Sequence, residues 1–157
     1  MSEPKEVSKE AYASFEGERW NALIDVVSGA DFNGLTPIQR VAHLVLCYSG
    51  DVLNGGHDQY FGNKENFDLS EVIAALNSVG ATCQREILKE ALIYYLKALE
   101  NMPQGYDEYI AWEQDYGYEA RMSKFDEQFY ACRPEIETEL LEDYLNTNEN
   151  EFIKWVP

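Results

Sequence analysis

The stretch Asn54-Gly55-Gly56-His57-Asp58-Gln59-Tyr60-Phe61-Gly62-Asn63 decides the fold of this chain. It follows a helical pattern directly and sets three glycines and two asparagines around an aromatic pair. The Asn-Gly-Gly part predicts a chain reversal, because Asn and Gly tolerate positive φ better than other residues do. We therefore expect Gly55 or Gly56 to hold a positive φ, and Tyr60 and Phe61 to fold back as buried anchors.

The sequence on both sides of this stretch has the period of α-helices, and no alternating segment of useful length indicates a strand. Thr36-Pro37-Ile38-Gln39 is a helix start, with Thr at the N-cap, Pro at the first helical position and Gln three residues after the cap. The helix that it opens is apolar almost all round from Val41 to Tyr48, which is typical of a central bundle helix. Asp68 and Glu71 predict a second capping box. Thr82 is predicted to cap the helix that follows. The predicted helices cover residues 15–28, 37–53, 69–79, 83–100, 106–115, 119–132 and 135–146.

These patterns predict an all-α, single-domain, compact bundle of about six to eight helices, with 41–53 and 87–99 at its centre. We expect residues 1–14 to form a partly ordered N-terminal arm and residues 15–157 to form the helical domain. The apolar tail from Phe152 to Pro157 is expected to dock on the body. No run of about 18 apolar residues predicts a membrane span, and the N-terminus has no signal-peptide pattern, so we expect a cytoplasmic protein.

The chain has 29 acidic and 12 basic residues, which gives a net charge of −17. Residues 107–157 hold fourteen carboxylates and four basic side chains, so this third alone carries −10. Such an excess repels nucleic acid as a direct ligand and fits either a solubility surface or a surface for a basic partner. In duplex DNA, 17 charges correspond to about 29 Å of helix axis. Several acidic segments would therefore have to lie side by side to imitate it.

The spacing of the glycine-rich stretch resembles the N-G-G-x-x-Q-Y-F-x-N motif of the bacterial DNA-mimic protein family, a family of domains of unknown function. The matching positions are Asn54, Gly55, Gly56, Gln59, Tyr60, Phe61 and Asn63. The resemblance implies an acidic, all-α homodimer without enzymatic activity that occupies the DNA-binding face of a transcription regulator such as a helix-turn-helix protein. It implies no cofactor, no metal, no direct nucleic acid and no membrane.

The carboxylates predicted to face the partner lie in three segments of the C-terminal third. They are Asp107, Glu108, Glu113, Asp115, Asp126, Glu127, Glu135, Glu139, Glu142 and Asp143. Glu135, Glu139, Glu142 and Asp143 fall on one arc of a helical wheel, opposite an apolar side. Glu139 and Asp143 form a like-charge pair one turn apart, which costs local stability and suggests either an unselected surface or use in binding.

Two other functions remain open at this level. An immunity-type inhibitor of a basic nuclease toxin would use the same electrostatic steering. A carboxylate-dependent metal hydrolase would use His57 with Asp58 or Glu65, although no metal-hydrolase motif supports it. His43 and Cys47 stand one helical turn apart, a nucleophile–base spacing, but on so apolar a helix we expect a buried histidine and a buried thiol. We expect Cys47, Cys83 and Cys132 to be reduced core thiols, with His43, Cys47 and Cys83 inert.

Overall fold

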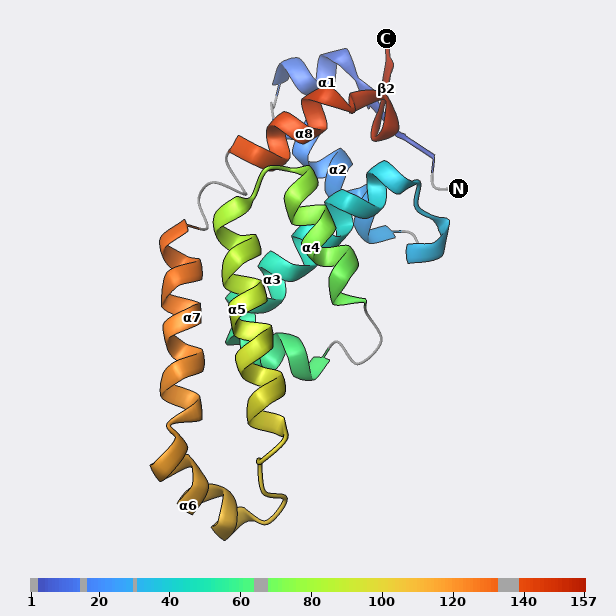
Figure 1. The fold of residues 1–157 in the computed structure, drawn as a ribbon. Helices are drawn as coiled ribbons and strands as arrows, with labels where there is room; N and C mark the ends of the chain where they lie inside the picture. Colours follow the sequence, from blue (N-terminus) through green and yellow to red (C-terminus); the bar gives the residue numbers. More distant parts are fainter. Residues whose placement is uncertain (1–2, 15–16, 30, 64–67, 133–138) are drawn as a thin grey trace.

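A computed structural model describes residues 3–14, 17–29, 31–63, 68–132 and 139–157. The all-α prediction is confirmed, since the described chain forms eight α-helices and two short strands (Figure 1). The elements are β1 (Lys5–Ser8), α1 (Lys9–Ser14), α2 (Glu18–Gly29), the 3-10 turn η1 (Phe32–Gly34), α3 (Pro37–Asn63), α4 (Leu69–Ser78), α5 (Thr82–Leu99), α6 (Tyr106–Tyr116), α7 (Tyr118–Cys132), α8 (Leu141–Thr147), the 3-10 turn η3 (Glu149–Glu151) and β2 (Ile153–Val156).

Helix α3 is the central element and contacts α2, α4, α5 and α7. It begins at the predicted capping box: the Thr36 amide donates to Gln39 Oε1 at 3.0 Å, and the Gln39 amide donates to Thr36 Oγ1 at 3.3 Å. These reciprocal bonds satisfy two amides that the first helical turn leaves without partners. Ala42, Val45 and Tyr48 on this helix are fully buried, as its apolar pattern predicts.

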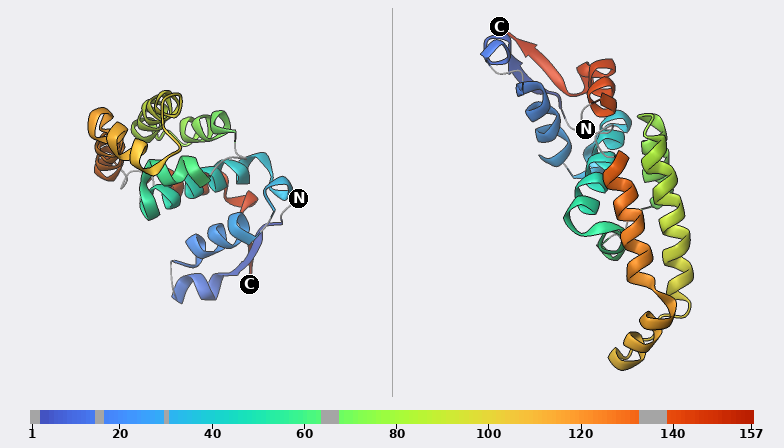
Figure 2. Two further views of the ribbon diagram at one scale, coloured as in Figure 1. Left: turned by 90° about the horizontal axis from the view of Figure 1, so that it is seen from below. Right: turned by 90° about the vertical axis from the view of Figure 1, so that its left-hand side faces the viewer.

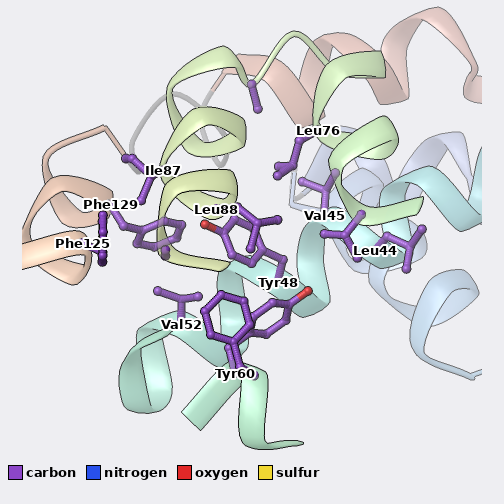
Figure 3. Close-up of a cluster of buried hydrophobic side chains, with 14 of the residues drawn as sticks. Leu44, Val45, Tyr48, Val52, Tyr60, Leu76, Ile87, Leu88, Phe125 and Phe129 are labelled. Atoms are coloured by element: carbon purple, nitrogen blue, oxygen red, sulfur yellow. The ribbon is translucent and has the colours of Figure 1, made fainter. Parts of the chain in front are cut away.

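The main core forms where α3, α4, α5 and α7 meet, and Tyr48 lies near its centre (Figure 3). The Tyr48 ring packs edge-on against Tyr60 at 5.1 Å and against Phe129 at 5.5 Å between centroids. Tyr60 is 1 % and Phe61 6 % exposed, so the prediction that both anchor the core is confirmed. Edge-to-face aromatic pairs contribute about 0.5–1.5 kcal/mol beyond their buried area, so this cluster fixes the second half of α3.

Helices α5 and α7 lie side by side and extend away from the chain termini, with α6 joining their far ends (Figures 1 and 2). Ile87, Leu88 and Ala91 are buried in the first half of α5. In the second half of the helix, Ile93 is 68 % and Leu96 53 % exposed on the outer side, while Ala98 is fully buried on the inner side. One side of α5 therefore stays in the core along its length, and its outer side carries apolar residues that are exposed to solvent.

The two ends of the chain meet in a parallel two-stranded sheet, in which Lys5 pairs with Ile153 and Val7 with Trp155. The prediction of no strands is wrong here, because four-residue strands are too short to display a period of two. Phe152 and Ile153 are buried with Leu23 in a second core beside α2, which confirms that the tail docks on the body.

The predicted helix ends are largely confirmed. Asp68 accepts a hydrogen bond from the Ser70 amide at 2.8 Å. Hydrogen bonding from the Ser70 side chain, and then from its amide, lowers the pKa of the Asp68 carboxyl. Helix α4 is followed by Gly80 at φ 80°. Thr82 is the first residue of α5 and Ala81 its N-cap, so the prediction that Thr82 caps this helix is wrong. No helix in the described ranges combines the length and the apolar character needed to cross a membrane.

Candidate functional site

The glycine pair breaks α3 in the middle of the predicted motif. Gly56 has φ 75° and ψ 178°, which confirms the predicted positive φ, and Gly55 has φ −160° and ψ 20°. A Cβ built on Gly55 would collide with the side-chain amide of Gln59, and one built on Gly56 would collide with the carboxylate of Asp126. Gly56 is therefore required by its backbone conformation and by the close approach of Asp126, whereas the Gln59 side chain next to Gly55 is flexible and can move aside.

Directly after the break, His57 is fully buried between two hydrogen-bond partners. Asp126 Oδ1 lies 2.8 Å from the His57 amide nitrogen and 2.7 Å from Nδ1, and Tyr48 Oη lies 2.9 Å from Nε2. Because a carboxylate only accepts, Nδ1 carries the proton and Nε2 accepts from the Tyr48 hydroxyl. Burial raises the pKa of Tyr48 well above its ordinary value, which keeps that hydroxyl protonated.

This network joins α3 to α7, and we name it the joint (Gly55, Gly56, His57 and Asp126). The neighbouring Asp58 accepts a hydrogen bond from the Tyr118 hydroxyl, which adds a second link to α7. The partner of His57 is distant in sequence, because Asp126 reaches it from 69 residues away. Since both ring nitrogens are engaged, the joint offers no open histidine for acid–base chemistry.

The other candidate chemical groups differ from their predictions in burial. His43 and Cys47 are half-buried, Cys83 is exposed and Cys132 is buried, so the prediction of uniformly buried side chains is wrong. His43 Nδ1 lies 2.7 Å from the Val27 carbonyl oxygen, and Nε2 lies 3.4 Å from Cys47 Sγ. Apolar patterning predicts which face of a helix is inward but not where the neighbouring helix stops. Glu65, proposed as a metal ligand, lies outside the described residues; within them, no three His, Cys, Asp or Glu side chains are placed to share a metal ion.

The predicted acidic residues are spread along one end-to-end series of helices. Asp107, Glu108, Glu113 and Asp115 are on α6, Asp126 and Glu127 on α7, Glu142 and Asp143 on α8, and Glu139 just before α8. Helices α6 and α8 lie at opposite ends of α7 in two perpendicular views (Figures 1 and 2). Glu135 lies outside the described residues. The three groups therefore follow one another along the length of the molecule.

Two of these carboxylates have partners inside the chain. Asp126 belongs to the joint, and its side chain is 20 % exposed. Glu113 accepts from the Tyr118 and Glu119 amides, both at 3.0 Å, and so caps the start of α7. Gly117, at φ 67°, makes the sharp connection that brings Glu113 to this position. The sequence signal for the cap was a carboxylate placed before a glycine and a new helix.

The remaining predicted carboxylates are exposed. In the part of the chain that the structure describes, none of them forms an ion pair; they are Asp107, Glu108, Asp115, Glu127, Glu139, Glu142 and Asp143. Unpaired exposed carboxylates remain available to a partner from outside the chain. We name these seven residues the acidic series.

Helix α6 is held at the end of the molecule by an aromatic cluster. Tyr116 of α6 packs on Tyr94 of α5 with centroids 5.9 Å apart, and Trp112 of α6 packs on Tyr118 of α7 at 5.8 Å. The Tyr109 hydroxyl donates to Glu119 at 3.1 Å. Burial, followed by this hydrogen bond and nearby negative charge, raises the pKa of Tyr109 to about 12.

Comparison with known proteins gives one result at the level of the family. No curated protein and no solved structure has a significant match to the chain. The model of the DMP19-like protein family matches residues 33–148, which include the joint and the whole acidic series. This match covers most of the chain, and the protein therefore belongs to the DMP19-like family.

Proposed function

We propose that this protein is a non-enzymatic DNA mimic, which occupies the DNA-binding face of a transcription regulator in the cytoplasm. The observation that carries the proposal is the acidic series, seven exposed carboxylates on or next to successive helices that form no ion pair within the described residues. Membership of the DMP19-like family supports the same role. A basic helix-turn-helix regulator is the kind of partner whose surface such charge attracts.

The density of carboxylates along one copy of the protein can be compared with the density of phosphates along duplex DNA. The fifteen residues of α7 span about 22 Å, a length over which duplex DNA carries about 13 phosphates. The acidic series supplies seven carboxylates over α7 and both neighbouring helices, and Arg121 and Lys124 interrupt it. One copy is therefore sparser in charge than DNA, and a pair of copies would double the number of carboxylates.

We also propose that the protein pairs with a second copy through the outer face of α5. Ile93 and Leu96 are exposed at adjacent positions of this face, where an antiparallel copy would place each of them opposite the other. In that arrangement Lys89 lies opposite Glu100 of the second copy, so the charges are complementary. Replacing Ile93 and Leu96 with Ser should convert a dimer to a monomer in sedimentation equilibrium, whereas a parent that is monomeric at every concentration contradicts the pairing.

The mimic proposal is tested by competition between the protein and operator DNA for helix-turn-helix regulators of the same genome. The test variant Glu139→Gln/Glu142→Gln/Asp143→Asn, combined with Asp107→Asn/Asp115→Asn, removes five charges and keeps side-chain shape. We expect it to displace operator DNA at least about tenfold less well than the parent, with the difference shrinking as salt rises.

The matched control is Glu3→Gln/Glu10→Gln/Asp31→Asn/Glu71→Gln/Glu90→Gln, which removes five exposed carboxylates outside the acidic series and outside the proposed contact between copies. Equal loss in both variants would mean that only total charge matters and would contradict a defined binding surface. Displacement of a nuclease toxin, with no effect on any regulator, would replace the mimic by the immunity-type inhibitor.

A further inference from the structure

Helix α6 differs from the other long helices because none of its residues is buried. Its inner side is the half-exposed aromatic cluster, and its outer side carries Tyr106, which is 78 % exposed, and Ile110, which is 38 % exposed. Tyr106 and Ile110 stand four residues apart and therefore lie on one side of the helix, one turn from each other. Large apolar side chains that are exposed to solvent at neighbouring positions are typical of interaction surfaces.

Carboxylates flank this apolar pair. Asp107 and Asp115 are both exposed; Asp107 lies about 60° from Ile110 on the helical wheel, and Asp115 lies further round the exposed surface of α6, about 140° from Ile110. From Ala98 to Ala120 the chain has six carboxylates and no Lys or Arg. The other end of the molecule is different, because Arg19 pairs with Glu149 at 2.8 Å and Lys154 with Glu6 at 2.7 Å. The α6 end is thus the region where a positively charged partner meets least competition from the protein's own cations.

The helix is also fixed before any partner arrives. The contacts of Tyr116 with Tyr94 and of Trp112 with Tyr118, together with the cap from Glu113 to the start of α7, hold α6 from its inner side. A rigid helix loses little conformational entropy on binding, so its exposed contacts contribute more fully to affinity.

We propose that the outer face of α6 (Tyr106, Asp107, Ile110 and Asp115) is the docking surface for a basic amphipathic helix of another protein. Apolar side chains of that helix cover Tyr106 and Ile110, while its lysines or arginines meet Asp107 and Asp115. A second copy of this chain does not fit, because it would bring the same carboxylates against each other. This inference rests on the proposed function for the basic character of the partner, and it adds an apolar contact that duplex DNA does not offer.

The apolar contact has a measurable consequence. Salt screens the attraction between exposed charges but has little effect on the burial of Tyr106 and Ile110. Binding at this face should therefore retain a component at high salt, and the two kinds of residue should be separable by their salt dependence.

The probe is a fluorescent helical peptide with leucines on one side and lysines on the other, titrated into the full-length protein. Its controls are a scrambled peptide of the same composition and a peptide with glutamates in place of the lysines. We expect the amphipathic lysine peptide to bind at least about tenfold more tightly than either control.

Three variants then locate the site, each checked for an unchanged melting temperature. Tyr106→Ser/Ile110→Ser should weaken peptide binding by a similar factor at low and high salt. Asp107→Asn/Asp115→Asn should weaken it at low salt and reduce its salt dependence. Glu3→Gln/Glu71→Gln, which removes the same charge from exposed positions outside the acidic series, should leave the affinity within about twofold.

Equal losses in the α6 charge variant and in Glu3→Gln/Glu71→Gln would overturn the proposal, as would parental binding by Tyr106→Ser/Ile110→Ser or equal binding of the scrambled peptide. Peptide binding at α6 without displacement of operator DNA from any regulator would reject the DNA-mimic function and keep this docking surface. Displacement of operator DNA that is equally strong in the parent and in the α6 variants would keep the DNA-mimic function and reject this docking surface.

Discussion

The joint and the outer face of α6 are both rich in polar and aromatic groups. These groups are largely buried and hydrogen-bonded at the joint but exposed on α6. At the joint, His57 is fully buried and both its ring nitrogens have partners at 2.7–2.9 Å. On α6, Tyr106 is 78 % exposed, and Asp107 and Asp115 have no ion-pair partner among the described residues. The family motif therefore stabilises the fold, while the surface available for binding lies outside it.

The same comparison divides the acidic residues into those that are hydrogen-bonded within the fold and those that are exposed, although each carries the same charge. Asp126 and Glu113 belong to the predicted acidic set, but each is occupied by backbone amides of this chain. A buried donor that loses its acceptor costs about 1–3 kcal/mol, whereas an exposed charge without a partner costs almost nothing to remove. Stability measurements can therefore sort the acidic residues into those that hold the fold and those that are free.

The largest expected effect is at Gly56. Gly56→Ala places a Cβ at φ 75°, which costs about 1–2 kcal/mol, and displaces Asp126 from His57, which costs about 1–3 kcal/mol more. We expect the free energy of unfolding in urea to fall by about 2–5 kcal/mol in total. The matched control is Gly50→Ala in the same helix, where a Cβ meets nothing within 4 Å and should add about 0.5–1 kcal/mol. Similar values for the two variants would show that the joint is not needed.

The next largest effect is expected at Asp126. Asp126→Ala leaves the His57 amide and Nδ1–H without an acceptor, so the free energy of unfolding should fall by about 2–4 kcal/mol. Glu127→Ala removes an exposed carboxylate from the next position of α7 and should change it by less than about 0.5 kcal/mol. If Asp126→Ala is as mild as Glu127→Ala, water replaces the carboxylate at the joint.

A smaller effect is expected from Tyr109, whose pKa is raised to about 12. A raised phenol pKa means that the folded state holds the proton more tightly, so the stabilising contribution is complete below pH 10 and disappears as the pH rises from about 10 to about 12. Glu119→Gln removes the negative charge beside the hydroxyl and should lower the pKa of Tyr109, but not to 10, because burial remains. Ring-labelled NMR titration measures this shift, and an unchanged pKa in the variant would assign it to burial alone.

Local sequence signals predicted the local features of this fold well. The capping box at Thr36, the positive φ in the glycine pair and the burial of Tyr60 and Phe61 all depend on residues within a few positions of each other. The features that were missed depend on distant residues. Asp126 reaches His57 across 69 positions, and the strand pair brings Lys5 to Ile153.

The candidate binding surface was predictable only in part, for a related reason. The sequence identified an acidic C-terminal third. It did not reveal that Glu113 and Asp126 are used internally, or that Tyr106 faces solvent. Whether a carboxylate is free depends on which backbone amides surround it, and helical period carries no such information.

The smallest expected effect is the change in stability when two exposed carboxylates of α6 are neutralised. Asp107 lies in the first turn, where the helix dipole favours a negative charge by about 0.3–1 kcal/mol, and Asp115 lies in the last turn, where the dipole disfavours it by a similar amount. The two contributions nearly cancel in Asp107→Asn/Asp115→Asn, so the free energy of unfolding should stay within about 0.5 kcal/mol of the parent. Glu113→Ala on the same helix removes the cap of α7 and should cost about 1–2 kcal/mol. Chemical denaturation of both variants measures the contrast. If the double variant loses as much stability as Glu113→Ala, its carboxylates have a structural role and are not reserved for a partner. If it is as stable as the parent, these charges do not stabilise the fold, and the loss of peptide binding in the same variant reports on recognition alone.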